Sequence, residues 1–250
     1  MKLSLSPRRL GKSLAWKLFP LADVGFTLKS GITIPIVDRS ELATFRGMII
    51  EQVWDPFLDA LPFFPRTVLD LGCNCGYFPL LIHHRARLHD VDMREAHFVL
   101  VDANPRLVRR ARDVIALNRL PGQFVFVSGL IGPRNQRVPF YTHPHSDSSS
   151  LFRHSSRSKT LHLSSLDLTQ LLDAHFPGPV DLMKCNIEGG ERYLVTDWVD
   201  ALRRARAIVI EWHDFAMPWE EFAGCLQAVG FDLVSAEERG NFRVALFSRQ

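Results

Sequence analysis

From Thr67 onward, short apolar runs alternate with stretches whose apolar residues recur at helical spacing. Runs that are apolar throughout are typical of strands buried on both faces of a parallel sheet. A C-terminal pair of runs joined by the turn ERGN predicts an antiparallel hairpin. The pattern therefore predicts an α/β fold, a Rossmann-like and mostly parallel sheet with a C-terminal antiparallel hairpin and helices on both faces. The predicted strands are 67–71, 97–102, 123–128, 180–186, 206–212, 231–235 and 242–248, and the predicted helices are 76–84, 105–118, 190–204 and 218–229.

The pattern before residue 65 predicts a small extension packed on this core. Residues 26–36 carry two apolar runs around Ser30-Gly31, which indicates a short hairpin. Asp38 then offers a helix cap, and apolar residues follow at helical spacing. We therefore expect an N-terminal extension over 1–64, helical with a short hairpin, and one domain over 65–250.

Composition narrows the class of protein. The chain has 250 residues, 46% of them hydrophobic, which is enough for one sizeable core. Thirty Lys and Arg nearly balance 27 Asp and Glu, and they are scattered, so no nucleic-acid partner is expected. No apolar stretch is long enough to span a membrane. The first twenty residues are basic, and we interpret them as a helix packed on the domain, with weak contact to an anionic membrane surface as the alternative.

Cysteine usage bears on the compartment. The four cysteines are too sparse for a disulfide framework, so reduced cysteines in a cytoplasmic enzyme are expected. Cys73 and Cys75 form a C-x-C without a partner pair at zinc spacing. The oligomeric state is left open by the sequence.

The segment VLDLGCNCGYF, residues 68–78, carries the most chemical information. A buried strand ends at Asp70, Gly72 and Gly76 follow, and a helix begins directly after them. Glycines at such a turn allow a ligand to approach the backbone beyond the carboxyl ends of the strands. The next strand ends at Asp102, which lies 26 residues past Gly76, and a carboxylate there can accept both hydroxyls of a ribose. The loop therefore predicts a nucleoside site.

The spacing of the loop discriminates between nucleosides. A dinucleotide site requires G-x-G-x-x-G, but Asn74 stands where the second glycine would fall. S-adenosylmethionine carries no phosphate, and a carboxylate such as Asp70 could place its ammonium group directly or through water. The pattern therefore favours S-adenosylmethionine over NAD as the cofactor. Ser128 and Gly129, which end the third strand, are expected near the adenine edge.

Further segments complete an ordered set of motifs. They are VDANP with ALNRL, SDSSSL at 146–151, SSLDL at 164–168, KCNIEGGE at 184–191 and IVIEWH at 208–213. With the glycine loop, this set resembles the FkbM-type methyltransferases from about residue 45 to 215. KCNIEGGE resembles the family's lysine-x-aspartate-x-glutamate-glycine-x-glutamate motif, although Asn186 stands where the family typically has aspartate.

This resemblance implies a class I methyltransferase that transfers a methyl group from S-adenosylmethionine to a hydroxyl of a small molecule, sugar or natural product. It places Lys184, Asn186 and Glu188 beside the site of methyl transfer. The cofactor-binding residues are expected to be Asp70, Gly72, Asn74, Gly76, Phe78, Asp102 and Ala103, together with Ser128 and Gly129.

The general base is expected at the carboxyl ends of the fourth and fifth strands. An alcohol is a poor nucleophile near neutral pH, so a positioned base assists its attack. Our hypothesis is that His213 or Glu188 is that base, with Lys184 and Asn186 orienting cofactor and substrate. The alternatives are structural: Glu188 as a cap of a helix near Gly190, Lys184 paired with Glu188 or Glu211, and His213 as a hydrogen-bonded core residue.

Two other questions stay open at this point. Residues 143–159 are rich in Ser, His and Arg, and we interpret them as a polar loop over the site rather than as a metal site, so no metal is expected. Two other functions remain alternatives to an O-methyltransferase: a non-catalytic cofactor-binding protein, because of Asn186, and an NAD-dependent oxidoreductase.

Overall fold

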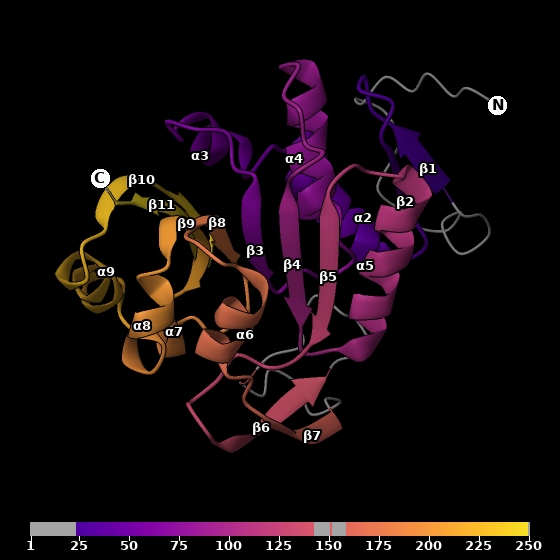
Figure 1. Cartoon of the computed structure of the whole chain (residues 1–250). Helices are drawn as coiled ribbons and strands as arrows, with labels where there is room; N and C mark the ends of the chain where they lie inside the picture. The colour runs from indigo at the N-terminus through magenta and orange to yellow at the C-terminus, as the bar shows by residue number, and fades with distance from the viewer. Residues whose placement is uncertain (1–23, 143–150, 152–158, 250) are drawn as a thin grey trace.

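Seven strands of the computed structural model form one sheet, in the order β10–β11–β9–β8–β3–β4–β5. The neighbours from β9 to β5 pair in parallel, whereas β11 runs antiparallel to both β9 and β10. This arrangement confirms the predicted mostly parallel sheet with its C-terminal hairpin (Figure 1). The structure describes residues 24–142, 151 and 159–249. The strands are β3 (Thr67–Leu71), β4 (His97–Asp102), β5 (Gln123–Ser128), β8 (Val180–Cys185), β9 (Ala205–His213), β10 (Asp232–Arg239) and β11 (Phe242–Ser248).

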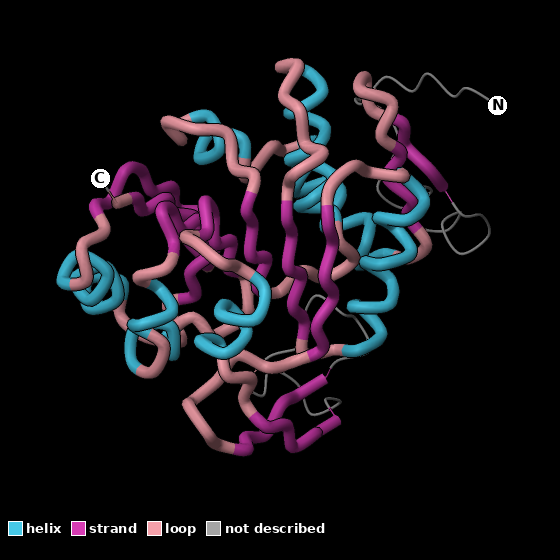
Figure 2. The backbone as a smooth tube through the Cα atoms, in the orientation of Figure 1, coloured by secondary structure: helices cyan, strands magenta, loops and turns pink. Residues whose placement is uncertain are grey.

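Helices cover both faces of this sheet, as Figure 2 shows. Side chains of a strand alternate between faces, so Val68 packs into one hydrophobic cluster and Leu69 into the other. The first cluster includes buried residues of α4 (Tyr77–Leu88) and α5 (Pro105–Asn118). The second includes residues of α6 (Leu168–His175), α7 (Arg192–Thr196), α8 (Val199–Leu202) and α9 (Trp219–Ala228). The continuous apolar runs of the sequence therefore reflect burial from both sides.

The single helix predicted over 190–204 is wrong, because two short helices, α7 and α8, replace it. The residues between them make tertiary contacts that interrupt the helix. The Trp198 indole donates to the carbonyl of Gly132 at 2.8 Å, and the Asp197 carboxylate accepts from the backbone N–H of Arg134 at 2.9 Å. Helical periodicity in the sequence does not reveal such contacts.

The described part of the N-terminal segment packs against α4 and α5. It contains the hairpin β1 (Val24–Thr27) and β2 (Thr33–Ile36), then α2 (Arg39–Phe45), the π-helical turn η2 (Arg46–Ile50) and α3 (Asp55–Asp59). Asp38 caps α2, as predicted, by accepting from the backbone N–H of Glu41. Glu41 in turn accepts from the Arg110 guanidinium at 2.6 Å and from the Tyr77 hydroxyl at 3.2 Å.

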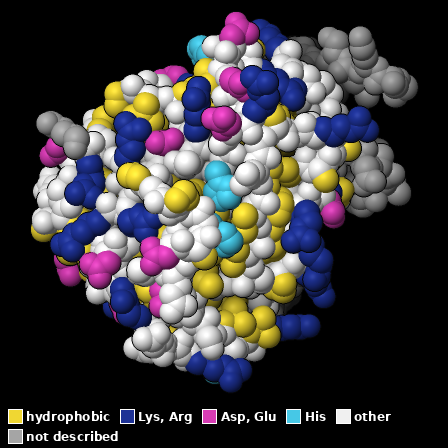
Figure 3. Space-filling model, viewed as in Figure 1, with side chains coloured by type: hydrophobic (Ala, Val, Ile, Leu, Met, Phe, Trp, Pro, Cys, Tyr) yellow, Lys and Arg dark blue, Asp and Glu magenta, His cyan; other side chains and the backbone are white. Residues whose placement is uncertain are grey.

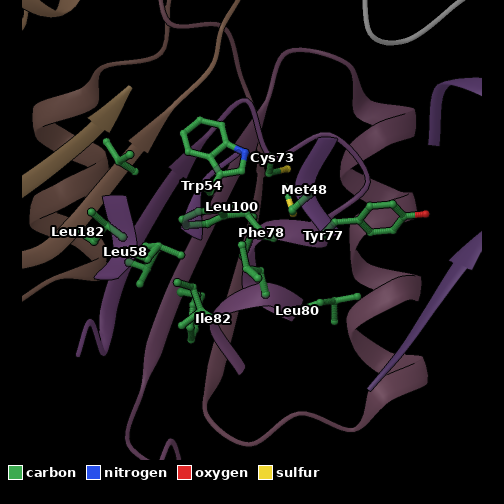
Figure 4. Close-up of a cluster of buried hydrophobic side chains, with 14 of the residues drawn as sticks. Met48, Trp54, Leu58, Cys73, Tyr77, Phe78, Leu80, Ile82, Leu100 and Leu182 are labelled. Atoms are coloured by element: carbon green, nitrogen blue, oxygen red, sulfur yellow. The ribbon is translucent and has the colours of Figure 1, made fainter. Parts of the chain in front are cut away.

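Hydrophobic contacts reinforce this attachment. Met48 and Trp54 of the N-terminal segment lie in the same buried cluster as Phe78 and Leu80 of α4 (Figure 4). The division at residue 65 stays a prediction, and the basic first twenty residues lie outside the described part of the chain.

One further antiparallel pair was not predicted. β6 (Arg137–Thr142) and β7 (Lys159–Ser164) form a hairpin that lies at the carboxyl edge of the parallel strands in Figure 1. Lys159, placed in a loop by the sequence pattern, begins β7. The rest of the predicted polar loop lies outside the described residues, apart from Leu151.

The length of the helices and the distribution of surface charge are relevant to membrane and nucleic-acid partners. Among the described residues, no helix is both long and apolar enough to cross a membrane. On the face shown in Figure 3, basic and acidic side chains are interspersed around a central hydrophobic area. The expectation that no nucleic acid binds stays a prediction.

Candidate active site

A cavity of about 440 Å³ lies at the carboxyl ends of the parallel strands. It extends from the glycine loop after β3 to the ends of β8 and β9, which is where ligands bind in open α/β sheets. Asp70, Gly76, Ser128 and His213 do not line it. The predicted site residues on its wall are Gly72, Asn74, Phe78, Asp102, Ala103, Gly129, Lys184, Asn186 and Glu188.

The two glycines of the loop are required by packing within the protein. Gly72 has φ +76°, and a Cβ there would lie 1.7 Å from the carbonyl oxygen of Asn186. Gly76 has φ +81° at the start of α4, and its Cβ would lie 3.0 Å from Ala111 of α5. The sequence suggested close approach of a ligand as the reason for these glycines. The structure adds a tighter constraint, because the loops after β3 and β8 touch at Gly72.

Asp102 presents a fixed carboxylate to the cavity. One oxygen accepts from the backbone N–H of Asn104 at 2.8 Å and the other from that of Asn74 at 3.1 Å. Burial raises the pKa of Asp102 to about 6, although these two N–H groups oppose the increase. Asp102 is therefore largely ionised at pH 7, and each oxygen keeps capacity to accept a further hydrogen bond.

The loop after β3 contributes a buried, unpaired acceptor near the cavity. Asn74 has φ +48°, and its side-chain oxygen is buried without a hydrogen-bond partner among the described residues. Both Asn74 and Asp102 line the cavity. A buried acceptor of this kind requires a donor, and a bound ligand can supply one.

Asp70 lies behind the cavity wall and is paired with Lys184. The two residues are opposite each other on β3 and β8, and Lys184 Nζ lies 3.0 Å from the Asp70 carboxylate. Nζ also donates to the carbonyl of Gly72 at 2.7 Å and lies 5.7 Å from the ring centre of Trp54. Burial lowers the pKa of Lys184, but Asp70 more than compensates and raises it above the ordinary value.

This pairing changes the expected role of Asp70. Its side chain is 1% exposed and does not line the cavity. Asp70 therefore acts on the cavity by holding the Lys184 ammonium group, which does line it. Lys184 pairs with Asp70, rather than with Glu188 or Glu211 as the structural alternative proposed. A contact of Asp70 with the ammonium group of the cofactor stays a prediction.

Three carboxylates surround His213 at the ends of β8 and β9, and we call this group the His213 cluster: Glu188, Glu191, Glu211 and His213. The imidazole Nδ1 lies 3.3 Å from Glu191 Oε1. Nε2 lies 3.6 Å from Glu188 Oε2 and 3.8 Å from Glu211 Oε1, both longer than a hydrogen bond. Burial lowers the pKa of His213, but the carboxylates outweigh this effect and raise the pKa to about 9.

The loop between β8 and α7 holds this cluster together through Glu191, whose role sequence reasoning missed. Glu191 is fully buried and accepts from the backbone N–H groups of Ile187 at 3.1 Å and Gly189 at 2.7 Å. Glu188 does not cap a helix near Gly190, because α7 begins at Arg192. Instead, Glu188 has φ +52° and lies beside His213.

Glu211 and Asn186 also line the cavity, beside Glu188. Burial raises the pKa of Glu211, whereas His213, Lys184 and a side-chain hydrogen bond from Asn186 oppose the increase. The Asn186 side-chain oxygen is buried without a partner among the described residues.

The structure separates Ser128 from Gly129. Ser128 is exposed and lies off the cavity wall, whereas Gly129 lines the cavity. Sequence reasoning also missed Trp54 of the N-terminal segment, Phe140 of β6 and Phe242 of β11, which lie on the wall. No sequence motif marked these aromatic residues, because they come from three distant segments.

Comparisons with known proteins identify a family for this chain. The family model described as methyltransferase FkbM domain matches residues 74–241, more than half of the chain. A comparison with curated proteins finds no match.

Solved structures are similar to this chain at low sequence identity. Magnesium protoporphyrin IX methyltransferase from Synechocystis PCC 6803, with bound SAM, has a TM-score of 0.50 and 12% identity, over 98% of this chain and 100% of that chain. A ribosomal protein L11 methylase from Lactobacillus delbrueckii subsp. bulgaricus has a TM-score of 0.48 and 13% identity, over 80% and 78%. The first likeness supports the class I methyltransferase fold. The chain belongs to the FkbM methyltransferase family, and its cofactor is S-adenosylmethionine.

Proposed function

We propose that this protein is an O-methyltransferase that acts on a hydroxyl of a small molecule, sugar or natural product. The observation that carries the proposal is the position of Glu188 and Glu211 on the wall of the same cavity as Asp102 and Asn74. One end of the cavity fits the nucleoside, and the other presents carboxylates to an acceptor. A hydroxyl acceptor benefits from such groups, because it must lose a proton as it is methylated.

The cofactor end binds through Asp102 and the loop. The Asp102 carboxylate would accept from the ribose hydroxyls, and the backbone around Gly72 and Asn74 would hold the nucleoside. Lys184 positions this loop, because Nζ holds the carbonyl of Gly72 while Asp70 holds Nζ. When bound, S-adenosylmethionine supplies the methyl group: the acceptor oxygen bonds to the methyl carbon as the methyl–sulfur bond breaks.

The acceptor end supplies the base. We assign this role to Glu188 rather than His213, because a histidine with a pKa of about 9 is already protonated near neutral pH. Glu188 lies on the cavity wall with its side chain 28% exposed. It takes the hydroxyl proton of the acceptor. Protonated His213 opposes the rise in the pKa of Glu211 that burial causes, and Asn186 has the same effect on Glu211.

The first experiment separates cofactor binding from methyl transfer. Calorimetric titration with S-adenosylhomocysteine and with NAD is paired with a screen of sugars, polyols and phenols for transfer of a labelled methyl group. We expect S-adenosylhomocysteine to bind the wild type, Asp102→Ala to abolish that binding, and a hydroxyl acceptor to be methylated. Glu188→Gln should keep the binding and lower turnover by about 10²-fold or more.

Three outcomes would contradict the proposal in different ways. Binding of NAD alone would favour an oxidoreductase. Binding of S-adenosylhomocysteine with methylation only of nitrogen or carbon acceptors would exclude O-methylation. Cofactor binding with no methylated acceptor in any class would favour the non-catalytic alternative that Asn186 raises.

A further inference from the structure

We propose that Glu188, Glu211 and His213 form a binding site for a divalent transition-metal ion at the acceptor end of the cavity. Each residue offers one ligand atom, and these atoms all lie within 4.8 Å of one another. The sequence pattern predicts no metal site here, because the three ligands come from two segments that meet only in the folded protein.

The distances around His213 are close to, but somewhat longer than, the ligand–ligand spacings around a metal ion. The separations of 3.6 Å and 3.8 Å from Nε2 to Glu188 and Glu211 are too long for hydrogen bonds. Two ligand atoms at this separation subtend about 120–130° at an ion that lies roughly 2.1 Å from each of them. Small rotations of the two glutamate side chains would therefore bring all three atoms onto one ion.

The other nitrogen of the imidazole supports the same assignment. Nδ1 contacts Glu191, which is fully buried and held by two backbone N–H groups. Histidine ligands of metals characteristically donate their second ring N–H to a carboxylate, which fixes the ring and leaves the first nitrogen for the metal. Glu191 therefore takes the position of a supporting residue, and Nε2 faces the two remaining carboxylates.

The charges of the region favour a cation. Glu188, Glu191 and Glu211 are 28%, 0% and 16% exposed at the side chain, and Lys184 is engaged by Asp70. Three carboxylates converge here around one imidazole. An ion of charge +2 that displaces the proton of His213 Nε2 would add one further positive charge among them. The Asn186 side-chain oxygen, buried without a partner among the described residues, lies on the same cavity wall.

The ligand set indicates the class of ion. Imidazole combined with carboxylates suits Mn²⁺, Fe²⁺ or Zn²⁺ better than Mg²⁺, which prefers oxygen ligands alone. This inference rests on the proposed O-methyltransferase function for its chemical role. A hydroxyl oxygen bound to the ion would lose its proton more readily, to solvent, and Glu188 would then serve as a ligand rather than as the base.

Metal binding is measured directly by titration of the metal-free wild type with Mn²⁺, followed by electron paramagnetic resonance and repeated by calorimetry with Zn²⁺. We expect one ion per chain, with affinity reduced about 10-fold or more in Glu188→Gln, Glu211→Gln and His213→Asn. The matched control is Glu51→Gln, because Glu51 lines the same cavity away from the cluster and pairs with Arg46. This control should bind Mn²⁺ as the wild type does.

Binding of S-adenosylhomocysteine by each variant shows that the variant is folded. No Mn²⁺ or Zn²⁺ binding by the wild type, or binding unchanged in the three variants, would overturn the metal site. Methyl transfer at full rate in a chelator would overturn the chemical role of the ion, while leaving the proposed function intact. Metal binding that depends on the cluster in a protein that methylates no hydroxyl would instead contradict the proposed function alone.

Discussion

The two ends of the cavity are built in different ways. At the proposed cofactor end, beside β3 and β4, the backbone N–H groups of Asn74 and Asn104 hold Asp102, and the buried Asp70 is matched by Lys184. The acceptor end, at β8 and β9, gathers three carboxylates around one imidazole. A site for one invariant cofactor can be encoded by a short local segment. A site for the acceptor depends on side chains from separate segments, so it can change without altering the loop.

The largest expected effect comes from the point where the two ends touch. Gly72→Ala should destabilise the protein by about 3 kcal/mol or more, because its Cβ would overlap the carbonyl of Asn186, a backbone atom that cannot rotate away. Chemical denaturation measures the free energy of unfolding of the variant and of the wild type. Gly240→Ala is the control, since Gly240 also has positive φ but no atom within 4 Å of its Cβ, and it should cost about 1 kcal/mol. Equal losses in the two variants would show that the loops do not constrain each other.

A smaller effect is expected within the acceptor end. Glu191→Gln should lower the free energy of unfolding by roughly 2–3 kcal/mol, because the amide nitrogen of glutamine cannot accept from the N–H of Ile187 or Gly189. The comparison variant is Glu237→Gln on the exposed strand β10, which should change stability by less than about 0.5 kcal/mol. If Glu191→Gln is equally harmless, the loop is not held by this side chain.

The cofactor end should respond to pH. Since the pKa of Asp102 is raised to about 6, the carboxylate gains a proton as the pH falls through 6 and loses capacity to accept from the ribose. We expect the affinity for S-adenosylhomocysteine to fall about tenfold between pH 7 and pH 5. Calorimetry on the wild type and on Asp102→Asn tests this, and the variant should bind weakly with little change over that range. A wild-type affinity that is constant down to pH 5 would contradict the role of Asp102.

The smallest effect is expected at the end of β5. Ser128 is exposed and off the cavity wall, so Ser128→Ala should leave the affinity for S-adenosylhomocysteine unchanged within about twofold, as for most surface substitutions. Calorimetric titration of the variant with S-adenosylhomocysteine measures this affinity. A clear loss of affinity would restore Ser128 to the cofactor site that the sequence pattern predicted.

Prediction succeeded where local pattern and burial agree. The strands β3, β4, β8 and β9 were predicted because both of their faces are buried, which leaves continuous apolar runs such as Phe98 to Val101. β7 was missed because it is mostly exposed and carries no such run. The helix over 190–204 was predicted too long because the Trp198 indole donates a hydrogen bond to the carbonyl of Gly132, a residue that is distant in the sequence.

In the candidate site, too, residues placed by local sequence were predicted and residues placed by tertiary packing were not. Asp102 and the glycine loop were found because a single strand-turn-helix segment and the next strand place them. Trp54 and Phe242 were not found, because only the packing of the N-terminal segment and of β11 brings them to the cavity.

The sequence by itself determined the mostly parallel sheet, the strands buried in it and the glycine loop, because each follows from residues that are close along the chain. Only the tertiary structure decided which charges meet. It paired Lys184 with Asp70 rather than with Glu188, and it surrounded His213 with carboxylates. The physical reason is that ion pairs and pKa values depend on distances of a few ångströms across neighbouring strands, and those distances are set by sheet register and loop geometry.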